Sequence, residues 1–133
     1  MAGPLTLSVG AHASSLGPMR KVLRAWLTDV GADQIADVVL AVDEAVANAI
    51  EHSGLGYHGE ITVEAYVVGT IVHIEVCDHG VWKEPTFDDT RGRGLIIMNA
   101  VMDAVSIEHR VNDTRIVMSR QLRNRPFEPR HVP

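Results

Sequence analysis

The spacing of apolar residues changes along the chain, and this change constrains the fold more than any other feature. Between residues 16 and 52, apolar side chains recur at steps of three and four, which is typical of amphipathic helices. Between residues 61 and 76 they alternate with polar residues, which indicates half-buried strands in a hairpin. Such a chain must bury helices and strands against each other.

The residues that interrupt this spacing set the expected boundaries of the elements. Gly31 ends the first helix, Gly69-Thr70 offers a tight turn, and Asn112-Asp113 offers another. The expected elements are a strand over 5–9, a helix over 16–30 capped by Ser14 or Ser15, a helix from about 32 to 52, a hairpin over 61–67 and 72–76, a loop over 78–93, a helix over 95–102, and a closing hairpin over 104–109 and 114–120. This order predicts an α+β two-layer α/β sandwich, with helices on one face of a mixed sheet.

Length and composition predict one domain. The chain has 133 residues, of which 46% are hydrophobic and 22% charged, so it can bury a sizeable core. We expect the domain to cover residues 1–122 and residues 123–133, rich in proline and arginine, to form a disordered tail or linker. Apolar runs are shorter than a membrane span, and no secretion signal precedes the domain, so a cytoplasmic location is expected.

Charge and cysteine usage exclude several classes of function. The net charge is −5, and residues 120–133 carry +3, which leaves −8 on residues 1–119. An acidic body disfavours binding to nucleic acid. The single cysteine, Cys77, excludes an internal disulfide, and the seven histidines lack the paired spacing of a structural zinc site. We expect His52, His73, His79 and Cys77 to be neither nucleophiles nor metal ligands.

Two polar residues of the second helix could carry chemistry. Glu44 and Asn48 are four residues apart and therefore adjacent on one helix face. They lie about 160° and 120° from Val42, the centre of the apolar stripe. Either they form a solvated polar face, or they combine a carboxylate base with an amide oxygen able to ligate Mg²⁺. The spacing leaves both interpretations open.

Two further segments have a functional and an ordinary interpretation. Asp78 ends a strand, where sites often form, although aspartate also commonly opens a turn. Arg91-Gly92-Arg93-Gly94 leads into the third helix, where glycines and free N–H groups could accommodate a phosphate. Trp82 either anchors the loop to the domain or lines a site, whereas Trp26 falls in an apolar stripe and is expected in the core.

Taken in order, three segments resemble the ATP-binding fold shared by DNA gyrase, heat-shock chaperones, sensor histidine kinases and a mismatch-repair ATPase. Residues 42–52 are similar to its N box, Asp78-His79-Gly80 to its first glycine box, and residues 92–98 to its second. The resemblance is strongest to the anti-sigma-factor serine/threonine kinases of bacteria and covers about residues 5–122.

This resemblance implies a role for each matching residue and the cofactors ATP and Mg²⁺. Glu44 would polarise the attacking hydroxyl, Asn48 would ligate Mg²⁺, and Asp78 would hydrogen-bond the adenine amino group. The glycines of the second box would let a lid close over the phosphates, and Thr114 would support the adenine pocket. The residues implied in cofactor binding are Asn48, Asp78, Gly80, Arg91, Gly92, Arg93, Gly94, Leu95 and Thr114.

The resemblance also implies two protein partners. Such kinases phosphorylate a serine or threonine of an anti-anti-sigma protein, a STAS-type protein, and sequester a sigma factor when they are free to do so. Arg20, in the segment similar to the family's first helix, would contribute to partner binding, and a homodimer is left open. The chain departs from the family at Val81-Trp82, where a second glycine is usual, and at Asp113, where glycine is common. The alternative function is a non-catalytic module whose partner binding is gated by ATP.

Overall fold

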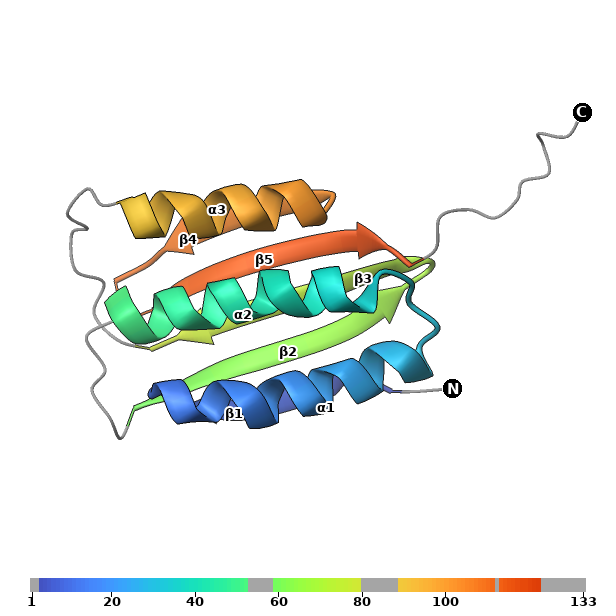
Figure 1. Ribbon diagram of the computed structural model, residues 1–133, viewed down its shortest axis with the longest axis horizontal. Coiled ribbons are helices and arrows are strands. Elements are labelled where there is room, and N and C mark those ends of the chain that lie inside the picture. The colour runs from blue at the N-terminus through green and yellow to red at the C-terminus, as the bar shows by residue number, and fades with distance from the viewer. Residues whose placement is uncertain (1–2, 53–58, 80–88, 112, 123–133) are drawn as a thin grey trace, which may run out of the picture.

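Helices and strands alternate in blocks along the chain, and all the helices cover one face of a single sheet (Figure 1). The computed structural model describes residues 3–52, 59–79, 89–111 and 113–122. The elements are β1 (Leu5–Gly10), the short 3-10 helix η1 (Ala13–Ser15), α1 (Leu16–Asp29), α2 (Ile35–His52), β2 (Glu60–Val68), β3 (Ile71–Asp78), α3 (Asp89–Val101), β4 (Ala104–His109) and β5 (Thr114–Gln121). The expected two-layer α+β sandwich is confirmed.

The sheet is antiparallel throughout, so the expectation of a mixed sheet is wrong. Its strand order is β1-β2-β3-β5-β4, and every neighbouring pair is antiparallel. The connection through α3 makes β4 run parallel to β3, but β5 lies between these two strands. β3 and β4 are therefore parallel to each other but are not hydrogen-bonded, because β5 separates them.

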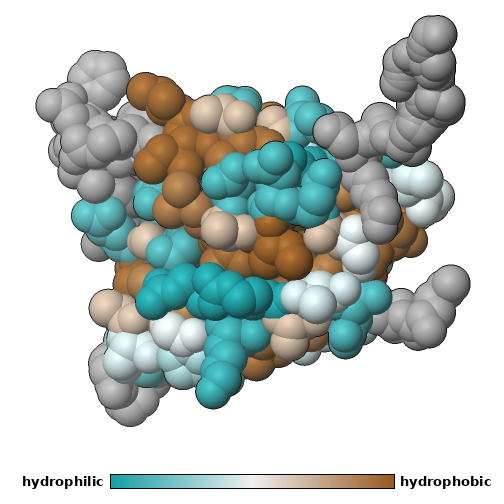
Figure 2. Space-filling model, turned by 45° about the vertical axis from the view of Figure 1, so that its right-hand side comes forward, coloured by the Kyte–Doolittle hydropathy of each residue, from teal (hydrophilic) through white to brown (hydrophobic). Residues whose placement is uncertain are grey.

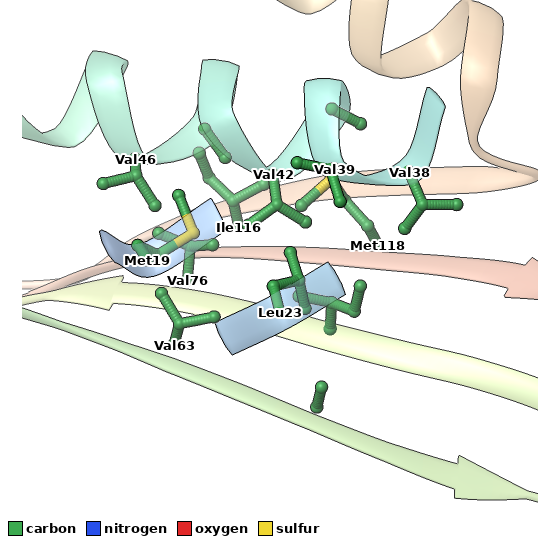
Figure 3. Close-up of a cluster of buried hydrophobic side chains, with 14 of the residues drawn as sticks. Met19, Leu23, Val38, Val39, Val42, Val46, Val63, Val76, Ile116 and Met118 are labelled. Carbon is green, nitrogen blue, oxygen red and sulfur yellow. The ribbon is translucent and has the colours of Figure 1, made fainter. Parts of the chain in front are cut away.

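The core lies between α2 and the sheet, where the two apolar patterns meet (Figure 3). Val42 and Val46 of α2 are fully buried, and so are Val63 of β2 and Met118 of β5. Burying side chains of this kind stabilises the fold by about 1.5–3 kcal/mol each. Trp26 of α1 is 7% exposed and donates from Nε1 to the carbonyl of Gly3 at 2.7 Å, which confirms its predicted place in the core.

Local backbone geometry explains where the helix boundaries differ from those expected. Ser15 is the N-cap of α1 but makes no capping hydrogen bond through its side chain, since its hydroxyl contacts the ring of His12. Gly31 has a φ of 80°, as its role of ending the first helix requires. Gln34 has a φ of 53°, which delays the start of α2 to Ile35.

The strands of both hairpins have nearly the bounds that the alternation of apolar and polar residues predicts. Gly69 has a φ of 64° in the turn between β2 and β3, a conformation that glycine adopts without strain. The predicted β4 and β5 agree with the structure to within a residue, whereas Asn112 of the predicted turn lies outside the described residues. The predicted tail over 123–133 also lies outside them. None of the helices described combines the length and apolar character needed to cross a bilayer.

Candidate functional site

Glu44 and Asn48 lie on the side of α2 that faces α3, next to Gly94. Both side chains are half-buried, and Gly94 is buried. A Cβ at Gly94 would come within 3.2 Å of both Glu44 Oε1 and Asn48 Nδ2. The absence of a side chain at this position therefore lets α3 approach the two polar groups closely. The pair is half-covered by a neighbouring helix, unlike a fully solvated polar face.

Asn48 also lines a small cavity between α2, α3 and the sheet. The other lining residues are Ala49, Val76, Asp78, Leu95, Ile107, Thr114 and Ile116. The cavity measures about 20 Å³, which is room for about one water molecule, so a larger ligand requires side chains such as Leu95 to move. The structure thus brings together four of the residues that the sequence singled out, Asn48, Asp78, Leu95 and Thr114.

Asp78 and Thr114 are the two buried polar residues among those the structure describes, each 2% exposed. They lie directly opposite each other where β3 pairs with β5. Thr114 Oγ1 is buried without a hydrogen-bond partner within the described part of the chain. Burying an unpaired hydroxyl costs free energy, so such a group commonly has a functional reason.

These features fit the nucleotide that the sequence predicts. A buried carboxylate beside an unpaired hydroxyl can recognise the hydrogen-bonding edge of a base. The amide oxygen of Asn48 is a suitable ligand for a hard cation such as Mg²⁺. Apolar side chains of Val76, Leu95 and Ile107 complete a wall on which a flat ring could rest.

The second glycine segment lies inside a helix, so the expected loop over 78–93 ends too late. α3 begins at Asp89, and Arg91, Gly92 and Arg93 belong to its first turns. The free N–H groups of this helix are those of its first turn, which includes Arg91 but not Gly94. Gly80 and Trp82 lie outside the described residues.

Arg20 is separate from this cavity. It lies on α1, and its Nη1 donates to Asp43 Oδ1 of α2 at 2.8 Å. The Arg20 side chain is 40% exposed and that of Asp43 is 21% exposed. No sequence pattern indicates the ion pair between Arg20 and the residue that precedes Glu44.

The apolar lining of the cavity is hard to predict from the sequence. Ala49 and Val76 fall in the apolar patterns of their helix and strand, and Ile107 and Ile116 fall in the closing hairpin. Their alternation places them on the helix-covered face, but which of them surround the cavity depends on how β4 and β5 meet α2. The contacting elements are far apart in sequence, so no local pattern could identify this lining.

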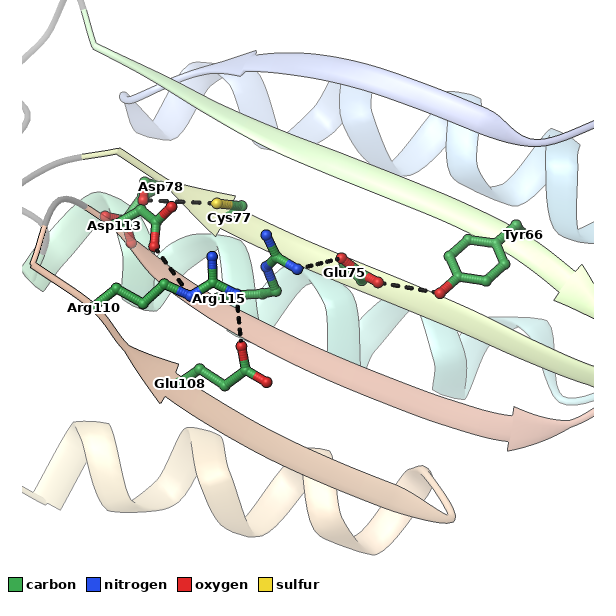
Figure 4. Close-up of polar contacts among 8 residues, drawn as sticks. All are labelled: Tyr66, Glu75, Cys77, Asp78, Glu108, Arg110, Asp113 and Arg115. Atoms are coloured by element: carbon green, nitrogen blue, oxygen red, sulfur yellow. Dashed lines mark hydrogen bonds and ion pairs between the residues drawn. The ribbon is translucent and has the colours of Figure 1, made fainter.

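The opposite face of the sheet carries a line of polar contacts (Figure 4). Tyr66 donates from its hydroxyl to Glu75 Oε2 at 3.1 Å, and Arg115 Nη1 lies 3.5 Å from Glu75 Oε1. Cys77 continues this line. Burial raises the pKa of the Cys77 thiol, and the charge of Asp113 raises it further. The thiol is therefore protonated at neutral pH in the absence of a metal ion.

The fold and this arrangement of side chains define the class of histidine kinase-like ATPase domains, and residues 9–120 match the family of that description. An anti-sigma F factor of Clostridium acetobutylicum is 30% identical over 106 residues, which cover 70% of this chain and 74% of the relative. An anti-sigma F factor of Thermoanaerobacter sp. (strain X514) is 34% identical over 92 residues, which cover 60% of this chain and 64% of the relative. The chain therefore belongs to the histidine kinase-like ATPase family, among its anti-sigma factor members.

Solved structures agree with this assignment. The crystal structure of the RsbU and RsbW domains of Rv1364c from Mycobacterium tuberculosis matches with a TM-score of 0.73 and 28% identity, covering 91% of this chain and 32% of that chain. The Acinetobacter baumannii histidine kinase AdeS matches with a TM-score of 0.56 and 10% identity, covering 90% of this chain and 68% of that chain, and so shares the fold alone. The resemblance predicted from the three boxes is confirmed.

Proposed function

We propose that this domain is an ATP-dependent protein serine/threonine kinase that also acts as an anti-sigma factor. It would phosphorylate an anti-anti-sigma protein of the STAS type and hold a sigma factor. The observation that carries the catalytic part is the placement of the Glu44 carboxylate and the Asn48 amide together under Gly94, beside the cavity that holds Asp78 and Thr114. The relatives named anti-sigma F factor support the regulatory part.

The position of each residue suggests its role in the proposed reaction. Asp78 and Thr114, buried at one end of the sheet, would bind the base. Asn48 would ligate Mg²⁺ through its amide oxygen. Bound Mg-ATP supplies the phosphoryl group, and Glu44, adjacent to Asn48 and half-buried, would accept the proton of the acceptor hydroxyl at a carboxylate oxygen. Gly94 lets the backbone of α3 lie close to this pair without displacing either side chain.

Nucleotide binding is tested first with the protein alone. Isothermal titration calorimetry with Mg-ATP and Mg-ADP should detect binding by the parent chain. Asp78→Asn should weaken it by about 1.5–3 kcal/mol, because a charge-assisted acceptor is lost. The control is Asp37→Asn, an exposed carboxylate in the first turn of α2. No heat from the parent protein at millimolar nucleotide would contradict the proposal.

Phosphotransfer is tested by single-turnover phosphorylation of a candidate STAS protein at saturating Mg-ATP. Glu44→Gln keeps the shape of the side chain but loses the proton acceptor, so transfer should fall about 10²–10⁴-fold while nucleotide affinity changes little. Glu64→Gln, an exposed glutamate on β2, is the matched control and should leave the rate unchanged. Equal rates for the parent and Glu44→Gln proteins would exclude Glu44 as the base.

The second candidate is a non-catalytic module in which nucleotide only selects the partner. The departures at Val81-Trp82 and Asp113 from the usual glycines favour it. Glu44 favours the kinase, since binding alone needs no base. Nucleotide binding with altered sigma-factor capture, but without phosphate transfer to any tested acceptor, would establish the module in place of the kinase.

A further inference from the structure

A sulfur, a nitrogen and an oxygen donor come together at the end of the sheet that carries Asp78. The Sγ of Cys77, a ring nitrogen of His79 and a carboxylate oxygen of Asp113 all lie within 4.8 Å of one another. Cys77 and Asp113 are half-buried, and His79 is exposed. Cys77 pairs with Arg115 and Asp78 with Thr114, so continuing this register brings His79 opposite Asp113.

This cluster lies on the helix-free face, opposite the proposed nucleotide site. Successive residues of a strand point to opposite faces. Asp78 and Thr114 face the helices, so Cys77 and Asp113 face away from them. Figure 4 shows Cys77 and Asp113 close together at this end of β3 and β5. The cluster is thus distinct from Asn48, the proposed Mg²⁺ ligand, and lies across the sheet from it.

The donors suit a borderline or soft divalent ion. Thiolate and imidazole favour zinc and similar metals, whereas Mg²⁺ prefers oxygen donors. Tetrahedral coordination of zinc holds its ligand atoms roughly 3.5 Å apart, so the three donors need to move only a short distance inward. Three protein ligands leave a fourth position for water.

The contacts around the cluster leave its acceptors available. Asp113 Oδ1 is buried and has no hydrogen-bond partner within the described residues, and its ion pair with Arg110 Nε is long, at 3.7 Å. Arg110 has a shorter contact, 3.0 Å, with Glu108 Oε1. The Cys77 thiol makes a weak contact, 3.9 Å, with the carbonyl oxygen of Asp78, and the side chain of Arg115 lies within hydrogen-bonding reach of it.

Arg115 is a second cation beside the cluster. Like Arg110, it forms an ion pair with a glutamate outside the cluster, in this case Glu75. Its Nη1 lies 3.5 Å from Glu75 Oε1. Neutralising the arginines therefore does not require Cys77 or Asp113. A divalent ion would balance the two negative charges of a thiolate and a carboxylate, and a neutral imidazole would complete the set of ligands.

In contrast to the expectation from the sequence that Cys77 and His79 are not metal ligands, we propose that Cys77, His79 and Asp113 bind a zinc-class divalent ion on the helix-free face of the sheet. Cys77 and His79 flank Asp78, and Asp113 precedes Thr114, so the ion would crosslink the ends of β3 and β5. Binding displaces the thiol proton of Cys77 to solvent, since a coordinated cysteine is a thiolate. Nothing in this proposal depends on nucleotide binding or on kinase activity.

The test uses the full chain stripped of metal and then titrated with Zn²⁺ or Co²⁺. We expect one equivalent of Zn²⁺ to bind at micromolar concentration and to raise the midpoint of thermal unfolding. Co²⁺ should give a thiolate-to-metal charge-transfer absorption. Cys77→Ser should abolish this absorption, and Cys77→Ser and Asp113→Asn should each weaken Zn²⁺ binding at least tenfold.

Two control variants address binding elsewhere on the chain. His73→Gln changes a histidine on the same face that stacks on Tyr66, and Asp103→Asn changes a carboxylate that accepts a hydrogen bond from the backbone of Gln121. Both should bind Zn²⁺ like the parent. Circular dichroism checks that every variant folds. The proposal is wrong if the parent fails to bind Zn²⁺ at micromolar concentration, or if folded Cys77→Ser binds it equally well.

Discussion

Two buried polar residues, Thr114 and Asp78, are expected to lower the stability of the fold. Thr114 buries a hydroxyl that lacks a hydrogen-bond partner in the described structure, although valine at this place would pack without that cost. The opposite residue, Asp78, is a buried carboxylate at the end of its strand. Both lie in the cavity that Asn48 lines. Polar groups retained in a core at a cost are expected where a ligand needs them.

Thr114→Val should therefore stabilise the domain while weakening nucleotide binding. We expect the free energy of unfolding to rise by about 1 kcal/mol, because the unpaired hydroxyl disappears. Urea denaturation measures this change, and calorimetry with Mg-ATP measures the loss of affinity. Thr70→Val is the control, since the Thr70 hydroxyl already accepts a hydrogen bond from Gln121 Nε2 at 2.6 Å. A loss of stability in Thr114→Val would contradict the interpretation of that hydroxyl as unpaired.

Because the pKa of Tyr66 is raised in the folded protein, the free energy of unfolding should depend on pH in the alkaline range. Burial raises this pKa above the ordinary value of 10.0, the hydrogen bond to Glu75 and the charges of Glu75 and Glu64 raise it further, and Arg115 lowers it. The folded state thus holds the phenol proton more tightly than the unfolded chain. This stabilisation is present below about pH 10 and is lost as the pH rises through the folded pKa.

The measurement compares the parent with Tyr66→Phe. Above pH 10 the free energy of unfolding of the parent should fall more steeply than that of the variant. Ultraviolet titration of the phenolate should show a lower pKa for Tyr66 in Glu75→Gln, which keeps a hydrogen-bond acceptor but removes the charge. Parallel stability curves for the parent and Tyr66→Phe would exclude a coupled phenol.

At the scale of elements, α3 is where the sequence prediction and the structure differ most. Charges and glycines ahead of Leu95 suggested a loop, because Gly92 and Gly94 each disfavour a helix by about 1 kcal/mol relative to alanine. Yet α3 begins at Asp89. Glycine is needed at position 94 because Glu44 and Asn48 leave little room for a side chain there. Helix propensity does not take such tertiary contacts into account. Gly94 is 46 positions from Asn48 and 50 from Glu44, so the contact leaves no local pattern.

Gly94→Ala separates stability from activity in this element. Alanine favours the helix by about 1 kcal/mol, so the domain should be as stable as the parent or more stable. The new methyl group would lie 3.2 Å from Glu44 Oε1 and Asn48 Nδ2 and would have to displace them. Single-turnover phosphorylation should fall at least tenfold, with thermal unfolding measured in parallel. Gly17→Ala, in an open part of α1, is the control. Full activity of Gly94→Ala would contradict this account.

At the scale of the whole molecule, the layers could be predicted but the strand order could not. Among the described residues the sequence predicted all five strands and most of α1, α2 and α3, but not η1 or the first turns of α3. The hydrophobic periods could not place β5 between β3 and β4, because the order depends on contacts between distant segments. For the same reason the sequence named Asn48, Asp78 and Thr114 one by one, through a resemblance, and only the fold brings them to one cavity.

The helix-bearing side is the surface from which a partner would meet both Arg20 and the site. Hydrophilic bands and hydrophobic patches interleave on it (Figure 2). Each helix contributes an exposed apolar side chain there: Val22 of α1 and Leu40 of α2 are both 42% exposed, and Ile96 of α3 is 69% exposed. Arg20 lies between α1 and α2, where it pairs with Asp43, and arginine is a residue type enriched at protein interfaces.

Arg20 tests whether this surface recognises a partner, as the proposed function requires. Arg20→Ala and Asp43→Asn both remove the 2.8 Å ion pair between α1 and α2, so each should cost at most about 1 kcal/mol of stability. If Arg20 anchors a sigma factor, only Arg20→Ala should weaken its capture, by tenfold or more, because interface arginines often contribute about 2 kcal/mol. Asp43→Asn leaves the guanidinium free to bind and should retain the affinity of the parent. Surface plasmon resonance against a sigma factor that the parent captures distinguishes the two variants. Equal losses in both would mean that the ion pair positions α1 and that Arg20 makes no contact with the partner.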